Sequence, residues 1–62
     1  MESFKVRRVR NGIRAIDIAA LVGVSPQAVE YYERACHKYR EATREKYEGA
    51  LDTLIAQRKE QS

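Results

Sequence analysis

The segment 22–26, VGVSP, constrains the fold more than any other, because it joins two helical patterns by a turn too tight to be a flexible link. Gly23 suits the end of a helix, where a residue that accepts positive φ is favoured, and Val24 follows it as an apolar plug. Ser25 and Pro26 suit the N-cap and the first position of a new helix. The sequence therefore predicts one helix on each side of the turn, over 15–22 and 26–35.

The apolar positions of these two helices are those that a steep crossing requires. Ile18, Ala19 and Val22 share one face of the first helix, and Val29 and Tyr32 share the inward face of the second. The outward face of the second helix then carries four residues: Gln27, Ala28, Tyr31 and Arg34. This pattern predicts a helix-turn-helix, which places its second helix in the major groove of DNA. The alternative is a helical hairpin that only packs.

Length and composition indicate a single all-α domain over 1–62. The chain has 62 residues, of which 44% are hydrophobic and 34% charged, a helix-rich globular balance without repeats. A chain of this size buries only about 60% of its unfolded surface. We therefore expect a homodimer, since pairing would add to a marginal stability.

The sequence does not predict a membrane, a metal ion or a cofactor as a partner. The apolar run from Ile13 to Val24 is broken by Arg14 and Asp17, so no membrane span is predicted. The first residues do not have the pattern of a signal peptide, so a cytoplasmic location is expected. One cysteine and one histidine are too few for a disulfide or a metal set, so Cys36 is expected to be a packing residue, and no cofactor is expected.

Basic charge flanks the predicted helix-turn-helix. Residues 1–14 carry five basic side chains against one acidic, residues 15–33 carry three acidic and no basic ones, and residues 34–62 carry seven basic against five acidic. Flanking cations suit a protein that grips phosphates while an uncharged helix face reads bases. The alternative is a solvated basic surface.

The N-terminal segment 3–10 fits a short helix capped by Ser3. Phe4, Val6 and Val9 would point inward and the arginines of this segment outward. The alternating FKVRRV pattern also fits a short strand, so both interpretations stay open. Asn11-Gly12 is the turn signal that follows.

The C-terminal helix is predicted over 40–58. Its apolar residues recur at helical spacing and form one buried stripe: Tyr47, Ala50, Leu51, Leu54 and Ile55. Gly49 costs about 1 kcal/mol relative to alanine inside a helix, which is expected where another backbone approaches closely. Gly49 and exposed apolar positions near Leu54 and Ile55 are the candidates for the dimer interface.

A wider motif runs through the chain: Arg8, Gly12-Ile13, Ile18-Ala19, Val22 to Ser25, Val29 and Glu33. With these residues the chain resembles the Cro and lambda-repressor-like family over about residues 4–55. The resemblance implies four or five helices arranged around a helix-turn-helix. It also implies a stand-alone transcriptional repressor of the kind that phages and mobile elements encode.

Two further likenesses are more limited. The TREK run from Thr43 to Lys46 is similar to the lac-repressor-type headpieces, which share the superfamily fold. The GVS and YYER motifs are similar to MerR-type regulators over a short stretch, but the wing signature of that family is absent. Ala35 departs from the glycine usual in the Cro-like pattern, and Glu33 from the apolar residue of the headpieces. Neither an effector domain nor a small-molecule effector is expected.

The resemblance also implies the DNA-contacting residues. Gln27, Ala28 and Tyr31 would face base edges, with Pro26 at the groove entrance. Gln27 can pair with adenine, Ala28 can touch a thymine methyl, and Tyr31 can donate to a base or a phosphate. The candidates for phosphate contacts are Arg14, Ser25, Arg34, Lys38 and Arg40, of which Ser25 is also the N-cap.

Two other classes of function are weighed against this one. A helical protein-interaction module, such as an antirepressor or an inhibitor of a larger protein, would account for the acidic second helix. An enzyme is not expected, because the sequence offers no paired carboxylates in an apolar setting, no nucleophile constellation and no phosphate-binding glycine loop.

Overall fold

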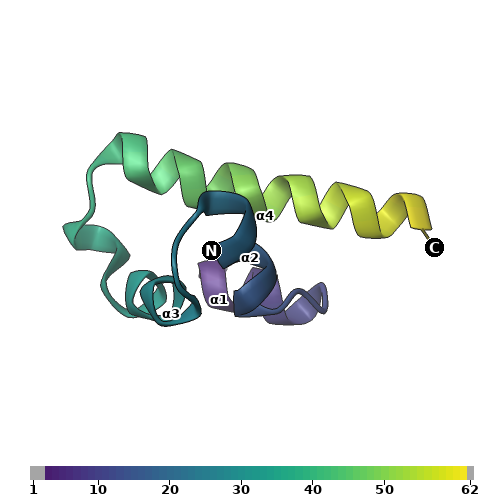
Figure 1. Cartoon of the computed structure of the whole chain (residues 1–62), viewed down its shortest axis with the longest axis horizontal. Coiled ribbons are helices and arrows are strands. Elements are labelled where there is room, and N and C mark those ends of the chain that lie inside the picture. Colours follow the sequence, from purple (N-terminus) through teal and green to yellow (C-terminus); the bar gives the residue numbers. More distant parts are fainter. Residues whose placement is uncertain (1–2, 62) are drawn as a thin grey trace.

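The chain folds into four α-helices and one short 3₁₀ helix in the computed structural model, which describes residues 3–61. They are α1 (Phe4–Arg10), α2 (Ala15–Val22), α3 (Pro26–Ala35), the 3₁₀ helix η1 (Cys36–Lys38) and α4 (Glu41–Gln61). Figure 1 shows α4 along one side of the molecule, with α1, α2 and α3 all on the same side of it. No strand occurs among residues 3–61, so the all-α prediction is confirmed and the strand alternative for 3–10 is wrong. Of the predicted domain 1–62, residues 1, 2 and 62 lie outside the described part.

Local capping explains where the helices begin and end. Ser3 and Ser25 each cap the helix that follows, because each Oγ accepts a hydrogen bond of 3.2 Å from the backbone N–H three residues later. Gly23 ends α2 in the left-handed conformation, with φ of 89°. The predicted bounds of α2 and α3 are therefore confirmed, whereas the C-terminal helix covers Glu41–Gln61 instead of 40–58.

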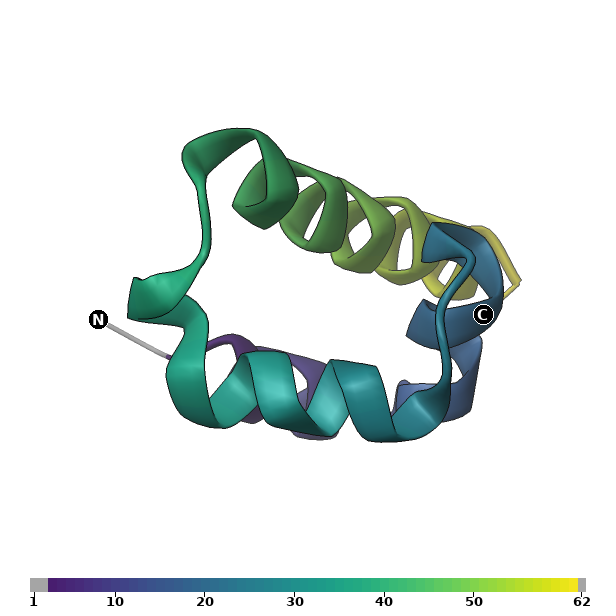
Figure 2. The ribbon, with the colours of Figure 1, turned by 60° about the vertical axis from the view of Figure 1, so that its left-hand side comes forward.

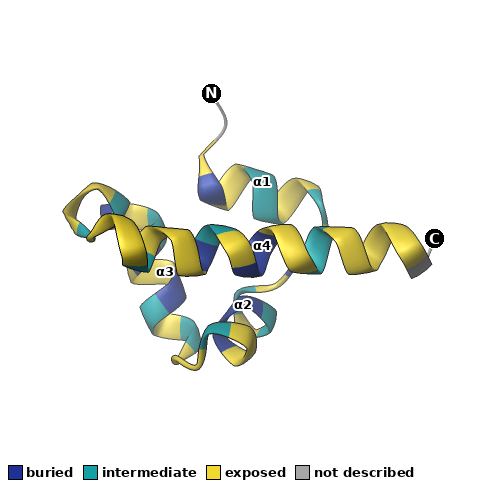
Figure 3. Ribbon diagram, turned by 90° about the horizontal axis from the view of Figure 1, so that it is seen from above, coloured by how far each residue is buried: buried dark blue, intermediate teal, exposed yellow. Residues whose placement is uncertain are grey.

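The hydrophobic core lies where α4 crosses the three shorter helices. Its most deeply buried residues are Ile18 and Ala19 of α2, Val29 and Tyr32 of α3, and Leu51 of α4, all 2% exposed or less. The core also contains Phe4, Ile13, Tyr47 and Ala50. Figure 3 shows that the buried residues of α4 lie in its middle and that both of its ends are mainly exposed. Among residues 3–61, no helix combines the length and the apolar character needed to cross a membrane.

Three valines lie differently from the prediction. Val6 and Val9 are 45% and 58% exposed instead of pointing inward, and Val24 is 38% exposed instead of plugging the turn. The short helix α1 packs through Phe4 at its start and through arginines on its protein-facing side, so its two valines are left on the solvent side.

The dimer candidates on α4 also need correction. Leu54 and Ile55 are partly buried and pack against the core, so they are not the exposed apolar positions that were expected. Apart from its two neighbours and the nearby backbone of α4, no atom of the described chain lies within 4 Å of the position that a Cβ at Gly49 would take, so no other element approaches this glycine closely. A homodimer stays a prediction, without the two apolar contacts first assigned to it.

All five aromatic side chains of the chain form one cluster. Tyr32 is at its centre and stacks on Tyr47, with ring centroids 4.0 Å apart and 7° between the planes. Phe4 and Tyr39 meet Tyr32 edge-on at 5.2 and 5.1 Å, and Tyr31 meets Tyr39 at 6.2 Å. Figure 2 shows α3 and α4 facing each other, with η1 linking them at one end. The cluster therefore ties α1, α3 and the segment after η1 to α4.

Ion pairs attach α1 to its neighbours. Arg7 pairs with Glu48 at 2.9 Å and with Asp52 at 2.6 Å, both on α4. Arg8 pairs with Glu33 of α3 at 2.6 Å. The predicted outward orientation of these two arginines is therefore wrong, because both turn toward acidic groups on other helices.

Candidate nucleic-acid interface

The turn between α2 and α3 is short and is held by backbone hydrogen bonds. The N–H groups of Gly23 and Val24 both donate to the Ala19 carbonyl, at 2.8 and 3.0 Å. A Cβ at Gly23 would meet nothing within 4 Å, so glycine is required there by its φ of 89° and not by lack of space. Ser25, two residues after Gly23, is already the N-cap of α3. The start of α3 is thus fixed relative to α2.

One face of α3 is open to solvent along its first turns. Gln27 is exposed and Tyr31, four residues later on the same face, is 49% exposed. Ala28 and Pro26 are partly buried beside them. The opposite face is buried in the core, so the predicted outward orientation of Gln27 and Tyr31 is confirmed. Arg34 continues the exposed side toward the end of the helix.

The Glu33 carboxylate does not lie on this open face. Its side chain is 4% exposed and that of Arg8 is 11% exposed. Arg8 Nε donates to Glu33 Oε2 at 2.6 Å and Nη2 to Oε1 at 3.3 Å, while Nη1 donates to the Ile13 carbonyl at 3.0 Å. This two-pronged contact fixes α3 to α1 and to the segment before α2. Glu30 is then the one acidic side chain that α3 exposes, so the helix presents less negative charge than its sequence indicates.

Arg14 is engaged at the start of α2. The Asp17 carboxylate accepts hydrogen bonds from the Arg14 backbone N–H at 3.1 Å and from its guanidinium at 3.2 Å. The Arg14 side chain holds the pKa of Asp17 below its ordinary value. Since this side chain is still 77% exposed, Arg14 can approach a second anion only while shared with Asp17.

The other predicted phosphate contacts differ in their surroundings. Arg34, Lys38 and Arg40 are exposed, at the end of α3, in η1 and just before α4. Their side chains have no hydrogen bond or ion pair with the rest of residues 3–61. The Ser25 hydroxyl accepts the capping hydrogen bond from Ala28 N–H, so its capping role is confirmed.

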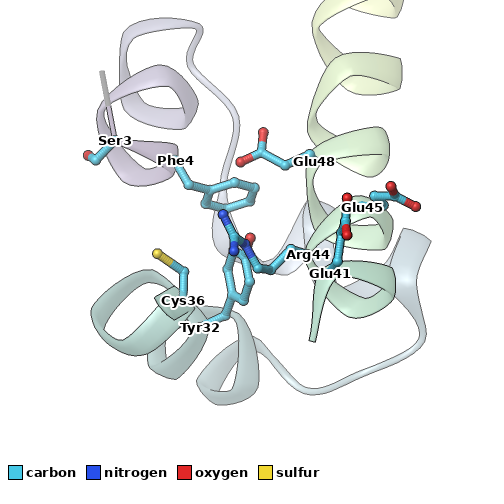
Figure 4. A pocket seen from close by; sticks show the side chains of 8 residues that line it. All are labelled: Ser3, Phe4, Tyr32, Cys36, Glu41, Arg44, Glu45 and Glu48. Carbon is cyan, nitrogen blue, oxygen red and sulfur yellow. The ribbon is translucent and has the colours of Figure 1, made fainter. Parts of the chain in front are cut away.

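A groove of about 460 Å³ opens between α1, α3, η1 and α4 (Figure 4). It is lined by Ser3, Phe4, Tyr32, Cys36, Glu41, Arg44, Glu45 and Glu48. Burial raises the pKa of the Tyr32 phenol, an effect that the nearby Arg44 opposes. Three carboxylates against one guanidinium make this groove unsuited to phosphate. Cys36 is partly buried and packs against the core, as predicted.

The structure also brings together cations that the sequence analysis did not connect. Arg58 and Lys59, near the end of α4, line a groove with Arg10 and Gly12 at the end of α1. The sequence contains a signal for each part separately, a basic pair in the last turns of a helix and a glycine turn. Nothing in the sequence indicates that the two meet.

The predicted contacts thus fall into groups in the structure. Gln27, Tyr31 and Arg34 lie along the exposed side of α3, Lys38 and Arg40 follow beyond its end, and Arg14 stands apart at the start of α2. Comparisons with protein-family models, curated proteins and solved structures give no match for this chain.

Proposed function

We propose that the chain is a sequence-specific DNA-binding regulator of the helix-turn-helix type, in which α3 enters the major groove. Of the functions that the Cro-like resemblance implies, a small homodimeric repressor fits best. The observation that carries the proposal is the exposed face of α3 with Gln27 and Tyr31, on a helix that is fixed at both ends. Gly23 and Ser25 fix its start, and the Arg8–Glu33 pair fixes its end. Base edges are read by the geometry of hydrogen bonds, so a reading helix needs both access and a fixed orientation.

The side chains on this face have the chemistry that base reading requires. The Gln27 amide offers one donor and one acceptor, the complement of the major-groove edge of adenine. Tyr31 can donate its hydroxyl proton to a base or to a phosphate, and Ala28 can contact a thymine methyl. Pro26 would lie at the entrance of the groove.

The charges around α3 support the same proposal. Arg34, Lys38 and Arg40 are exposed and unpaired within residues 3–61, so they can replace counterions on the DNA backbone. The alternative of a protein-interaction module depends on the negative charge of α3. This charge is reduced because Arg8 neutralises the Glu33 carboxylate at 2.6 Å.

The test is selection of binding sites from a pool of random duplexes, followed by affinity measurements on the enriched sequence. Gln27→Ala should weaken binding to the selected site by about 1–3 kcal/mol and change binding to unrelated DNA much less. Thr53→Ala, which truncates an exposed polar side chain on α4, serves as the matched control and should leave both affinities unchanged.

The pattern of the loss decides the outcome. Discrimination should disappear at one base-pair position per half-site, and thermal stability should barely change because the side chain is exposed. An equal loss on all sequences, or no loss at all, would refute the role of α3 as a reading helix.

A second candidate, protein binding, is favoured by one observation. Ile16 and Leu21 of α2 and Val24 of the following turn are 54%, 50% and 38% exposed. Large exposed apolar side chains are the groups that contacts with other proteins bury. If the wild-type chain shows no salt-dependent binding to any duplex, this candidate replaces the first, and Leu21→Ser should then abolish capture of the partner.

A further inference from the structure

Two adjoining grooves meet at the connection between α1 and α2. One, of about 470 Å³, is lined by residues that include Arg14, Asp17 and Arg58. The other, of about 430 Å³, is lined by residues that include Arg10, Arg58 and Lys59. Gly12 and Arg58 line both grooves. Among the residues that line the two grooves, four are basic (Arg10, Arg14, Arg58 and Lys59) and one, Asp17, is acidic.

The gathering depends on the backbone at Gly12. This residue has φ of 68°, and its N–H donates to the Val9 carbonyl at 3.0 Å, which ends α1. Because Gly12 lacks a side chain, the Arg58 guanidinium comes close to its Cα. A Cβ there would lie 3.1 Å from Arg58 Nη2. The last turns of α4 are thereby seated on the α1–α2 connection, which brings Arg58 and Lys59 beside Arg10.

The basic side chains at the α1–α2 connection lie at a distance from α3 that one DNA duplex can span. Figure 1 shows α3 toward one end of the long axis and the α1–α2 connection further along it, both on the same side of α4. The longest extent of the chain is 35 Å, close to one turn of a DNA duplex, which is about 34 Å. The α1–α2 connection therefore lies within the length of one duplex turn from α3.

We propose that Arg10, Arg14, Arg58 and Lys59, here called the basic cluster, form a second surface that binds the phosphate backbone of the DNA. This inference rests on the proposed function, and it adds a DNA-binding surface that lies outside α3. Guanidinium and ammonium groups are the side chains that bind phosphate oxygens. Arg14 also stands at the start of α2, where the helix dipole favours an anion. Asp17 opposes binding only in part, since its carboxylate already accepts hydrogen bonds from Arg14.

The cluster is expected to add affinity and no sequence preference. Phosphate contacts position a protein on the duplex without carrying sequence information. A phosphate-binding side chain is therefore revealed by the salt dependence of binding. The slope of log K against log[salt] becomes shallower by about 0.9 for each phosphate that the protein no longer neutralises.

Two exposed lysines on the same helix provide a matched test. Lys59→Gln removes a charge from the basic cluster, and Lys46→Gln removes the same charge from another part of α4. The probe is a random-sequence duplex of about 20 base pairs, since non-specific binding is governed by the backbone. The dissociation constant is measured by fluorescence anisotropy at several salt concentrations. We expect Lys59→Gln to lower the slope by about 0.9 and Lys46→Gln to leave it unchanged.

Arg58 gives a second, independent measurement. Arg58→Gln should also lower the slope, whereas Arg58→Lys keeps the charge and should keep the slope. The comparison of Arg58→Gln with Arg58→Lys is needed because Arg58 packs against Gly12. A change of slope that is caused by poor folding would appear in both variants. Far-UV circular dichroism of each variant confirms that it is folded.

The outcomes separate this inference from the proposed function. A normal wild-type slope that neither Lys59→Gln nor Arg58→Gln changes would overturn the basic cluster and leave α3 as the contact. A lowered slope in these variants, with no effect of Gln27→Ala on sequence preference, would support the cluster and refute sequence reading by α3. No salt-dependent binding by the wild-type chain would overturn both.

Discussion

Loss of the Arg8–Glu33 ion pair is predicted to be strongly destabilising. Arg8→Ala would leave the Glu33 carboxylate, whose side chain is 4% exposed, buried without a counter-charge. It would also remove the donor that reaches the Ile13 carbonyl at 3.0 Å. Breaking one partner of a buried pair costs about 3–5 kcal/mol.

This cost is comparable with the whole stability of the chain. At roughly 0.05–0.15 kcal/mol per residue, a domain of this length has about 3–9 kcal/mol to lose. Arg8→Ala should therefore remove a large part of the free energy of unfolding at 25 °C. Glu33→Gln should cost less, about 2 kcal/mol, because it keeps an acceptor of the same shape and because Arg8, at 11% exposed, retains some contact with water. Arg8→Met combined with Glu33→Leu should be near neutral, since it leaves no buried charge.

The assay is urea denaturation followed by far-UV circular dichroism on the wild type, both single variants and the double variant. Each single variant should lose more stability than the double variant, because only the single variants leave one partner of the pair without its counter-charge. A cost below about 1 kcal/mol for Arg8→Ala would show that the pair behaves as an exposed surface contact, and the argument from its burial would fail. The double variant should also bind DNA with less sequence preference, because it lacks the contact that orients α3.

Four further predictions concern glycines, pH, phosphate contact and assembly. Gly23→Ala should cost about 1–2 kcal/mol because of its positive φ, whereas Gly49→Ala, inside α4 with open space around it, should stabilise the chain by about 0.5–1 kcal/mol in thermal unfolding. Burial raises the pKa of Tyr32 above its ordinary 10.0, so the free energy of unfolding should hold below pH 10 and fall above it, and less steeply in Tyr32→Phe. Arg34→Ala should lower the salt slope of DNA binding by about 0.9, and Arg14→Ala likewise; an unchanged slope in both would remove them from the interface. Two copies should bind half-sites about 34 Å apart, a prediction that a single copy on DNA in sedimentation experiments at saturating protein would contradict.

The helix ends are predictable from sequence wherever one residue type determines the backbone. Gly23 can hold a positive φ, Ser25 can cap, and Pro26 can begin a helix, so α2 and α3 have the bounds that these residues predict. The exposed positions of Gln27 and Tyr31 follow from helical periodicity once those bounds are known.

The orientation of α1 is not predictable in this way. The side of α1 that faces the protein is determined by the ion pair between Arg8 and Glu33. These two residues are 25 positions apart in the sequence. The hydrophobic pattern alone favours inward valines, but Val6 and Val9 are exposed because the arginines face the protein. The basic cluster is hidden for the same reason, since it depends on the approach of Arg58 to Gly12 across the fold.

The five-ring aromatic cluster has a consequence for how the chain reaches its fold. Its rings come from Phe4, Tyr31 and Tyr32, Tyr39, and Tyr47, so nearly the whole chain must be present before the cluster can close. Folding is therefore expected to be all-or-none, and a fragment that lacks α4 should stay unfolded. Tyr31 is both the outer member of the cluster and part of the exposed face of α3. A chain still emerging from the ribosome thus cannot present that face in its final orientation until the last helix has been synthesised.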